Sequence, residues 1–263
     1  MVDFIGKERY NFQDVVSLVK FLRSENGCEW DRAQTHASIC RNFIEETYEA
    51  CEAMDDPAHL KEELGDVLLQ VVFHAGIEQD AGHFSVDDVC DGICKKLIER
   101  HPHLFSGGER QDWETMKRTQ RGDQTVGEAM QGVCKALPAT WRADKIQSKA
   151  EKTGFRWNDI NQSVAKLEEE LQELKQALQL PGDPEEELGD LLFAAVNVAR
   201  WLNADPEDLL NASCSKFTGR FSAMEEMAAR EGSALSEMTK EELLVYWEKA
   251  KALPEKIKKE VSL

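Results

Sequence analysis

Two acidic motifs with identical internal spacing are the residues of this chain best suited to chemistry. The first is Glu45-Glu46-x-x-Glu49 followed, twelve residues later, by Glu62-Glu63-Leu64-Gly65-Asp66. The second is Glu169-Glu170-x-x-Glu173 with Glu186-Glu187-Leu188-Gly189-Asp190, 124 residues further on (170 − 46). Residues three apart project from the same side of a helix, so each copy presents two pairs of carboxylates.

Gathering these carboxylates calls for a cation. Two helices joined by a short loop pack antiparallel, which can bring the two pairs face to face. Like charges repel, and burying them together without a positive charge raises their pKa values or costs free energy. Ligands that are all oxygen favour Mg²⁺ or Mn²⁺ over zinc and copper. No histidine follows a glutamate by three positions, which argues against a Glu-x-x-His di-iron site.

Basic and aromatic residues recur after each acidic motif. They are Lys96, Arg100 and Trp113 in the first copy, and Lys216, Arg220 and Trp247 in the second. A lysine and an arginine four apart share a helix face and could clamp phosphate oxygens together with Mg²⁺. The tryptophan could stack on a base or close a pocket. Surface position for the cations and core packing for the tryptophans remain open alternatives, and Trp30 and Trp157 are interpreted as structural.

Helical patterns dominate, and strand signals are scarce. Apolar residues at helical spacing and capping signals predict helices over 12–22, 36–54, 58–81, 164–178, 185–202, 206–229 and 241–251. Asp-Pro pairs begin the helices near 57, 184 and 206, and capping boxes follow Ser85 and Thr239. Gly65 and Gly189 lie in mid-helix, at a cost of up to about 1 kcal/mol against alanine. Close approach of a helix or a ligand could offset that cost.

The duplication predicts an all-α protein made of two helical-bundle domains. At 263 residues with 41% hydrophobic content, the chain can form two cores. The pattern loosens around 104–137, although 113–120 could form a short helix. The expected boundaries are therefore a first domain over 1–120, a linker over 121–137 and a second domain over 138–263.

Composition excludes several classes of partner. A net charge of −18 argues against a nucleic-acid surface. No apolar run approaches the roughly 20 residues that span a bilayer, and the first 18 residues do not resemble a signal peptide. Seven cysteines without a CxxC pair are typical of a reducing cytoplasm. The six histidines share no pattern between the copies, so a histidine nucleophile or base is not expected.

Taken together, these motifs resemble the two-domain bacterial form of the MazG nucleoside triphosphate pyrophosphohydrolases. The likeness runs almost end to end. It includes Gly27-Cys28-Glu29-Trp30-Asp31, both acidic motifs, Arg100-His101-Pro102-His103-Leu104-Phe105, Lys145-Ile146-Gln147 and Gly154-Phe155-Arg156-Trp157. The resemblance implies Mg²⁺-dependent hydrolysis of NTPs, and of dNTPs, to the monophosphate and pyrophosphate. It also implies helical-bundle domains that form a homodimer.

The resemblance also implies roles for individual residues of the second copy, which is credited with catalysis. The metal ligands would be Glu170, Glu173, Glu187 and Asp190; Lys166, Lys216 and Arg220 would contact phosphates, and Trp247 would lie near the nucleotide. The wider substrate-binding set adds Glu169, Glu170, Glu186, Glu187 and Asp190. Glu169 is the candidate to orient or deprotonate the attacking water, so the catalytic set is Glu169, Glu170, Glu173, Lys216 and Arg220.

The first copy retains its own set of site residues, namely Glu46, Glu49, Glu63, Asp66, Lys96, Arg100 and Trp113. It has Asn42 where the second copy has Lys166, so we expect it to bind metal and to turn over slowly. Two rival functions remain: a narrower dUTP or dCTP diphosphatase, and a non-catalytic helical adaptor whose acidic faces bind a basic partner.

Overall fold

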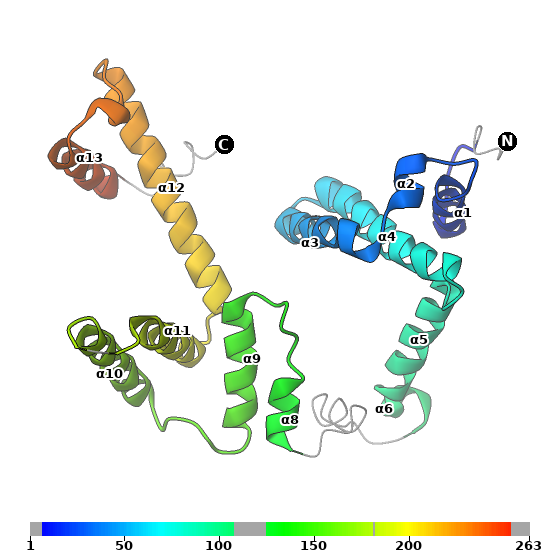
Figure 1. Ribbon diagram of the computed structural model, residues 1–263, viewed down its shortest axis with the longest axis horizontal. Helices are drawn as coiled ribbons and strands as arrows, with labels where there is room; N and C mark the ends of the chain where they lie inside the picture. The colour runs from blue at the N-terminus through cyan, green and yellow to red at the C-terminus, as the bar shows by residue number, and fades with distance from the viewer. Residues whose placement is uncertain (1–6, 108–124, 181, 254–263) are drawn as a thin grey trace. The chain divides into compact units, whose positions relative to one another are not determined.

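The computed structural model describes residues 7–107, 125–180 and 182–253, and every regular element in these ranges is a helix (Figure 1). The all-α prediction is confirmed. The chain divides into two compact units, Met1–Met116 and Lys117–Leu263. Within the expected linker, α8 (Val126–Gln131) forms a helix that packs against α9 (Ala139–Glu151). The short helix considered for 113–120, and Trp113 with it, lie outside the described residues.

The first unit is built around two paired helices that carry its acidic motif. Its elements are α1 (Phe12–Leu22), α2 (Glu29–Ala33), α3 (His36–Glu52), η1 (Ala53–Asp55), α4 (Pro57–Asp80), α5 (Val86–Glu99) and α6 (Pro102–Phe105). A capping box between Thr35 and Ser38 begins α3, and the Asp56 carboxylate caps α4 with Pro57 in its first turn. These local signals fix the register of the two acidic segments.

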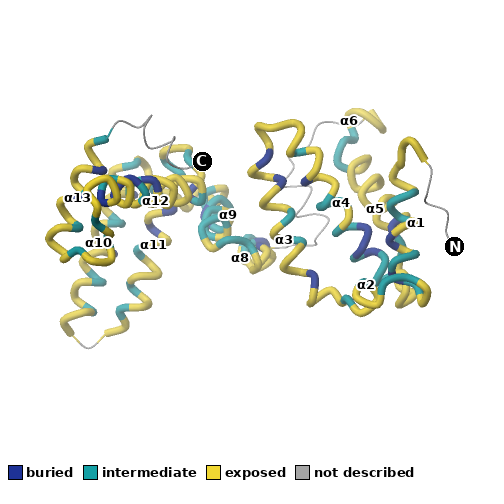
Figure 2. The backbone as a smooth tube through the Cα atoms, turned by 90° about the horizontal axis from the view of Figure 1, so that it is seen from above, coloured by how far each residue is buried: buried dark blue, intermediate teal, exposed yellow. Residues whose placement is uncertain are grey.

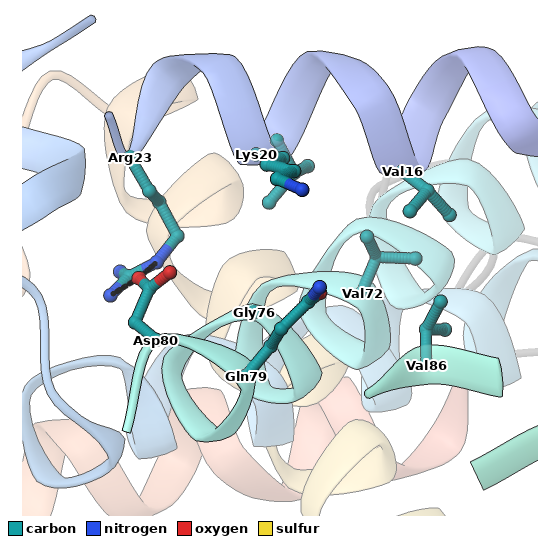
Figure 3. A pocket seen from close by; sticks show the side chains of 9 residues that line it. Val16, Lys20, Arg23, Val72, Gly76, Gln79, Asp80 and Val86 are labelled. Atoms are coloured by element: carbon teal, nitrogen blue, oxygen red, sulfur yellow. Dashed lines mark hydrogen bonds and ion pairs between the residues drawn. The ribbon is translucent and has the colours of Figure 1, made fainter. Parts of the chain in front are cut away.

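An apolar core joins α1, α3, α4 and α5 in the first unit. Its buried members are Val19, Ile39, Val72, Phe73, Ala75 and Val86. Burying such side chains supplies about 25 cal/mol for each Å² of apolar surface removed from water. Arg23 closes one end of this core, since its guanidinium lies 5.0 Å from the centre of the Phe73 ring and 3.0 Å from Asp80 (Figure 3).

The second unit repeats this order of helices. After α8 and α9 come α10 (Ile160–Ala177), α11 (Pro184–Trp201), α12 (Pro206–Arg230), η2 (Leu235–Glu237) and α13 (Lys240–Ala252). The acidic helices α10 and α11 pack on each other, and α9 packs on α11 as α1 packs on α4. Asp183 and Asp205 cap α11 and α12, and the predicted capping box between Thr239 and Glu242 begins α13.

The half of α12 toward its C-terminus forms a separate small core with α13 (Figure 1). That core contains Ala223, Met224, Ala228, Tyr246 and Ala250. Many large apolar side chains elsewhere on the helices remain exposed. Exposed residues of all types form the long yellow stretches of Figure 2. No helix among the described residues is long and apolar enough to cross a membrane.

Candidate metal centre

The structure brings three of the four predicted ligands of the second unit together. Glu170 on α10 and Glu187 and Asp190 on α11 place one carboxylate oxygen each within 4.8 Å of one another. Glu170 is buried, with 6% of its surface exposed. Glu173, the fourth residue, lies outside this group, one helical turn after Glu170 on α10. Two helices thus bring three acidic side chains close together, as the spacing predicts.

Crowding of negative charge is visible in the electrostatics of this group. Loss of hydration raises the pKa of Glu173, and the negative charge of Glu170 raises it further. Lys166 partly offsets the crowding, because its Nζ lies 2.8 Å from both Glu169 Oε1 and Glu170 Oε1. Those two bonds raise the pKa of Lys166, which therefore stays charged.

The first unit carries an equivalent group with different neighbours. Glu46, Glu63 and Asp66 also offer ligand atoms within 4.8 Å of one another. Desolvation, then the negative charge of Asp66, raises the pKa of Glu46. Glu63 is paired with His59 on its own helix, with 2.9 Å between His59 Nε2 and Glu63 Oε1. No lysine stands at the position of Lys166, which Asn42 occupies.

Both groups fit a hard divalent cation. Their ligand atoms are carboxylate oxygens, which Mg²⁺, Mn²⁺ and Ca²⁺ prefer. Loss of hydration, and then the charges of neighbouring carboxylates, raise the pKa values of Glu173 and Glu46, so keeping these side chains ionised in the clusters costs free energy. A divalent cation would offset that cost.

A cavity of about 660 Å³ adjoins the acidic group of the second unit. Lys166, Glu170 and Asp190 form part of its wall, so the cavity and the candidate metal position are continuous. The rest of the wall comes from α9, from the loop that follows it and from α11. These residues are Ile146, Gln147, Ala150, Glu151, Gly154, Phe155, Arg156, Trp157, Phe193, Ala194 and Asn197.

Lys216, Arg220 and Trp247 do not line this cavity. The Arg220 guanidinium lies 5.6 Å from the Trp247 ring, and its Nε is buried without a hydrogen-bond partner. Lys216 is exposed on the same helix. Their predicted contacts with phosphate therefore remain predictions, as do those of Lys96 and Arg100 in the first unit.

Two other predicted residues lie at the rim of the acidic group. Glu169 is 57% exposed at its side chain and is bound to Lys166, and Glu186 is exposed in the first turn of α11. A Cβ built on Gly65 or Gly189 would meet nothing within 4 Å. Tight packing against a described helix of the chain is thus wrong as the explanation of these glycines. The approach of a ligand stays a prediction.

Sequence reasoning gave no site role to the aromatic and amide residues of the cavity wall. Trp157 was interpreted as structural, Phe155 and Gln147 were matched only as motif residues, and Asn197 was not distinguished from its neighbours. One signal was available for Asn197, which follows Asp190 by seven residues and therefore lies two turns along the same face of α11.

All six histidines lie in the first unit, and one of them, His59, is paired with Glu63 of the acidic group. His36 Nδ1 and His74 Nδ1 are 2.7 Å apart, and Glu78 binds His36 at 2.6 Å and His83 at 2.7 Å. Burial lowers the pKa of His74, and the nearby His36 lowers it further. Hydrogen bonds from His36 and His83 lower the pKa of Glu78.

The fold and the site together place the chain in a class of helical proteins in which two paired acidic helices form a candidate divalent-metal site beside a cavity. A sequence model described as the MazG nucleotide pyrophosphohydrolase domain matches residues 34–105. A Thermotoga maritima protein named nucleoside triphosphate pyrophosphohydrolase/pyrophosphatase MazG is 46% identical over 248 residues, which cover 91% of this chain and 95% of that protein.

The chain is also similar to two further proteins over most of its length. The Escherichia coli K12 nucleoside triphosphate pyrophosphohydrolase is 37% identical over 90% of this chain and 95% of its own length. The Bacillus subtilis protein YabN is 41% identical over 92% of this chain, and the match covers 52% of YabN. The chain belongs to the MazG family.

Proposed function

We propose that the protein hydrolyses nucleoside triphosphates, both NTPs and dNTPs, to nucleoside monophosphates and pyrophosphate with Mg²⁺, and that the second unit does so. The observation that carries the proposal is the continuity between the Glu170–Glu187–Asp190 group and a cavity of about 660 Å³ that also contains Lys166. A triphosphate that is bound to a metal ion needs a positive charge nearby, and the organic group attached to it needs a cavity beside the metal. The names of the Thermotoga maritima and Escherichia coli relatives support the same activity.

The residues of the second unit divide between holding the metal and handling the phosphates. Glu170, Glu187 and Asp190 would hold Mg²⁺, and Glu173, one turn after Glu170 on α10, would be a fourth ligand. Mg²⁺ bound there would supply positive charge for the phosphate oxygens; Mn²⁺ is the expected substitute. Lys166 can exchange a bond to a carboxylate for one to a phosphate oxygen. Glu169 is then free to orient the attacking water and to accept its proton at a carboxylate oxygen.

A second copy of the chain would complete the site. Lys216, Arg220 and Trp247 form one surface of α12 and α13 and do not line the cavity of their own chain. Phe217 and Phe221, beside them on α12, are 56% and 41% exposed, which is typical of a surface covered by a partner. We infer a homodimer in which this surface faces the acidic group of the other copy.

Product identification tests the activity directly. The protein with Mg²⁺ should release pyrophosphate and a monophosphate, and no orthophosphate, from each of the four NTPs and dNTPs, and chelation of the metal should stop the reaction. Turnover confined to dUTP or dCTP would favour the narrower diphosphatase. Absence of pyrophosphate release at high protein concentration would contradict the proposal and favour the adaptor.

A further inference from the structure

The cavity beside the acidic group ends in a hydrogen-bonded amide network. Ser163 Oγ donates to Asn197 Oδ1 at 2.8 Å, and Asn197 Nδ2 donates to Gln147 Oε1 at 3.1 Å. Gln147 Nε2 in turn donates to the backbone carbonyl of Phe193 at 2.8 Å. Gln147 and Ser163 are buried, with 6% and 1% of their surfaces exposed. Asn197 lies about two helical turns, roughly 10 Å, along α11 from Asp190, and Ser163 lies the same distance along α10 from Glu170.

The polarity of this network is fixed by its last acceptor. The Phe193 carbonyl can only accept, so Gln147 must turn its amide nitrogen toward it and its oxygen toward Asn197. Asn197 must then present its nitrogen to Gln147 and its oxygen to the Ser163 hydroxyl. Each amide has one N–H and one lone pair left over. The end of the cavity therefore offers oriented donors and acceptors at a set position.

Aromatic side chains flank the same space. Trp157 and Phe155, from the loop between α9 and α10, line the cavity, and yet they are 39% and 81% exposed. Exposed aromatic rings next to side-chain amides suit a nucleobase. A nucleobase is a flat ring that stacks on aromatic faces, and the polar atoms at its edge form hydrogen bonds.

The first unit lacks this arrangement although it keeps the acidic group. Positions 39 and 73, which correspond to Ser163 and Asn197 (163 − 39 and 197 − 73 are both 124), hold Ile39 and Phe73. Both are buried in the apolar core, and Arg23 lies over the Phe73 ring. A cavity described in this unit, about 10 Å³ between α1, α4 and α5, is not lined by Glu46, Glu63 or Asp66 (Figure 3). The polar network accompanies the large cavity and not the acids alone.

We propose that the nucleobase of the substrate binds at the far end of this cavity, stacked on Trp157 and Phe155 with its edge against the amides of Asn197 and Gln147. This subsite rests on the proposed function, because the acidic group and Lys166 then hold the triphosphate at the other end. The amides contact the base and not the reacting phosphorus. They and the aromatic pair set the affinity for the base.

Trp157→Ala, compared with Trp30→Ala, tests the subsite. Trp30 is the matched tryptophan of the first copy (157 − 30 and 154 − 27 are both 127), is 62% exposed and lies outside the cavity. We expect Trp157→Ala to raise KM for ATP about tenfold or more, the effect of losing one base–aromatic stack. It should leave kcat and the inhibition constant of ribose 5′-triphosphate, which has no base, near the parent values. Trp30→Ala should leave KM, kcat and the inhibition constant unchanged.

Phe155→Ala provides a second variant whose folding is not at risk, because that side chain is mostly exposed; it should raise KM for ATP in the same selective way. An equal loss of affinity for ATP and ribose 5′-triphosphate, or no loss in either variant, would overturn the subsite while leaving pyrophosphate release by the parent intact. Absence of pyrophosphate release by the parent is a different result, since it would remove the proposed function itself.

Discussion

The two copies of the acidic motif hold their carboxylates alike and differ in what surrounds them. In both, three ligand atoms from two paired helices lie within 4.8 Å of one another. In the second copy a lysine pairs with the acids and a large cavity continues from them. In the first, Glu63 is paired with His59, and Ile39 and Phe73 fill the positions of the polar network.

This difference separates metal binding from substrate binding. The acids are retained in both copies, so their presence alone does not mark a catalytic site. We propose that the cavity of about 660 Å³ beside its acids, which gives space for the organic part of a substrate, distinguishes the second copy. The first copy uses the corresponding residues to build a core. We propose that these core residues, together with Asn42 at the position of Lys166, account for the slow turnover expected of the first copy.

The largest effect is expected from removing acids of one copy at a time. Glu170→Gln combined with Glu173→Gln should lower pyrophosphate release about a thousandfold, because loss of a charge-stabilising group in an active site costs that order of magnitude. The matched pair Glu46→Gln with Glu49→Gln should retain most of the activity. Steady-state pyrophosphate assays measure both; substantial turnover in the first pair would refute the assignment.

Giving the second copy the residues of the first should close its cavity. Ser163→Ile with Asn197→Phe replaces the hydrogen-bonded pair by the apolar pair that packs in the first unit. We expect kcat/KM for ATP to fall about a hundredfold, since contacts to the base are lost, while Mg²⁺ still binds. Calorimetry and thermal unfolding establish that the variant is folded. Unchanged kcat/KM would show that the cavity is not used.

Lys166 and Asn42 test whether one cation explains the difference between the copies. Lys166→Met removes the group that binds Glu169 and Glu170 and should raise KM for ATP about tenfold, the value of one charged hydrogen bond. Adding Asn42→Lys to the Glu170→Gln, Glu173→Gln variant should restore no activity. Phe73 still fills the position that corresponds to Asn197, in the core of the first unit. Recovered turnover would instead show that the missing lysine alone explains the difference in activity between the two copies.

The smallest effect concerns acid stability, which should differ between the units because the six histidines all lie in the first. The pKa of His74 is lowered in the folded state, so protonation favours unfolding and stability falls as pH drops below about 6.5.

From pH 7.5 to 5.5 we expect hydrogen exchange of α3 and α4 to increase more than that of α10 and α11, and Tm to fall by roughly 2 °C. His74→Leu should flatten this dependence. Equal acid sensitivity of both units would show that groups other than the histidines govern stability in this pH range. Glu78 is not such a group, because its lowered pKa confines its contribution to more acidic solutions.

Local signals allowed much of the fold to be predicted. Helix starts at Pro57, Pro184 and Pro206 follow from Asp-Pro caps, which act within a few residues. The helix α8 was missed inside the expected linker, although the capping box between Thr125 and Glu128 marks its start.

The acidic groups could be predicted because helical periodicity places their members, whereas the cavity could not. The bond between Gln147 and Asn197 joins residues 50 positions apart and depends on how α9 packs on α11. The same packing makes Trp157 part of the cavity wall. No spacing rule within one helix contains that information.

Calorimetric titration of Mg²⁺ in the presence of a non-hydrolysable ATP analogue tests the metal site of the second copy most directly. Glu170→Gln should abolish the uptake that depends on the nucleotide, and Glu46→Gln should preserve it. Uptake that survives Glu170→Gln, or that disappears with Glu46→Gln alone, would contradict the placement of the substrate site on α10 and α11.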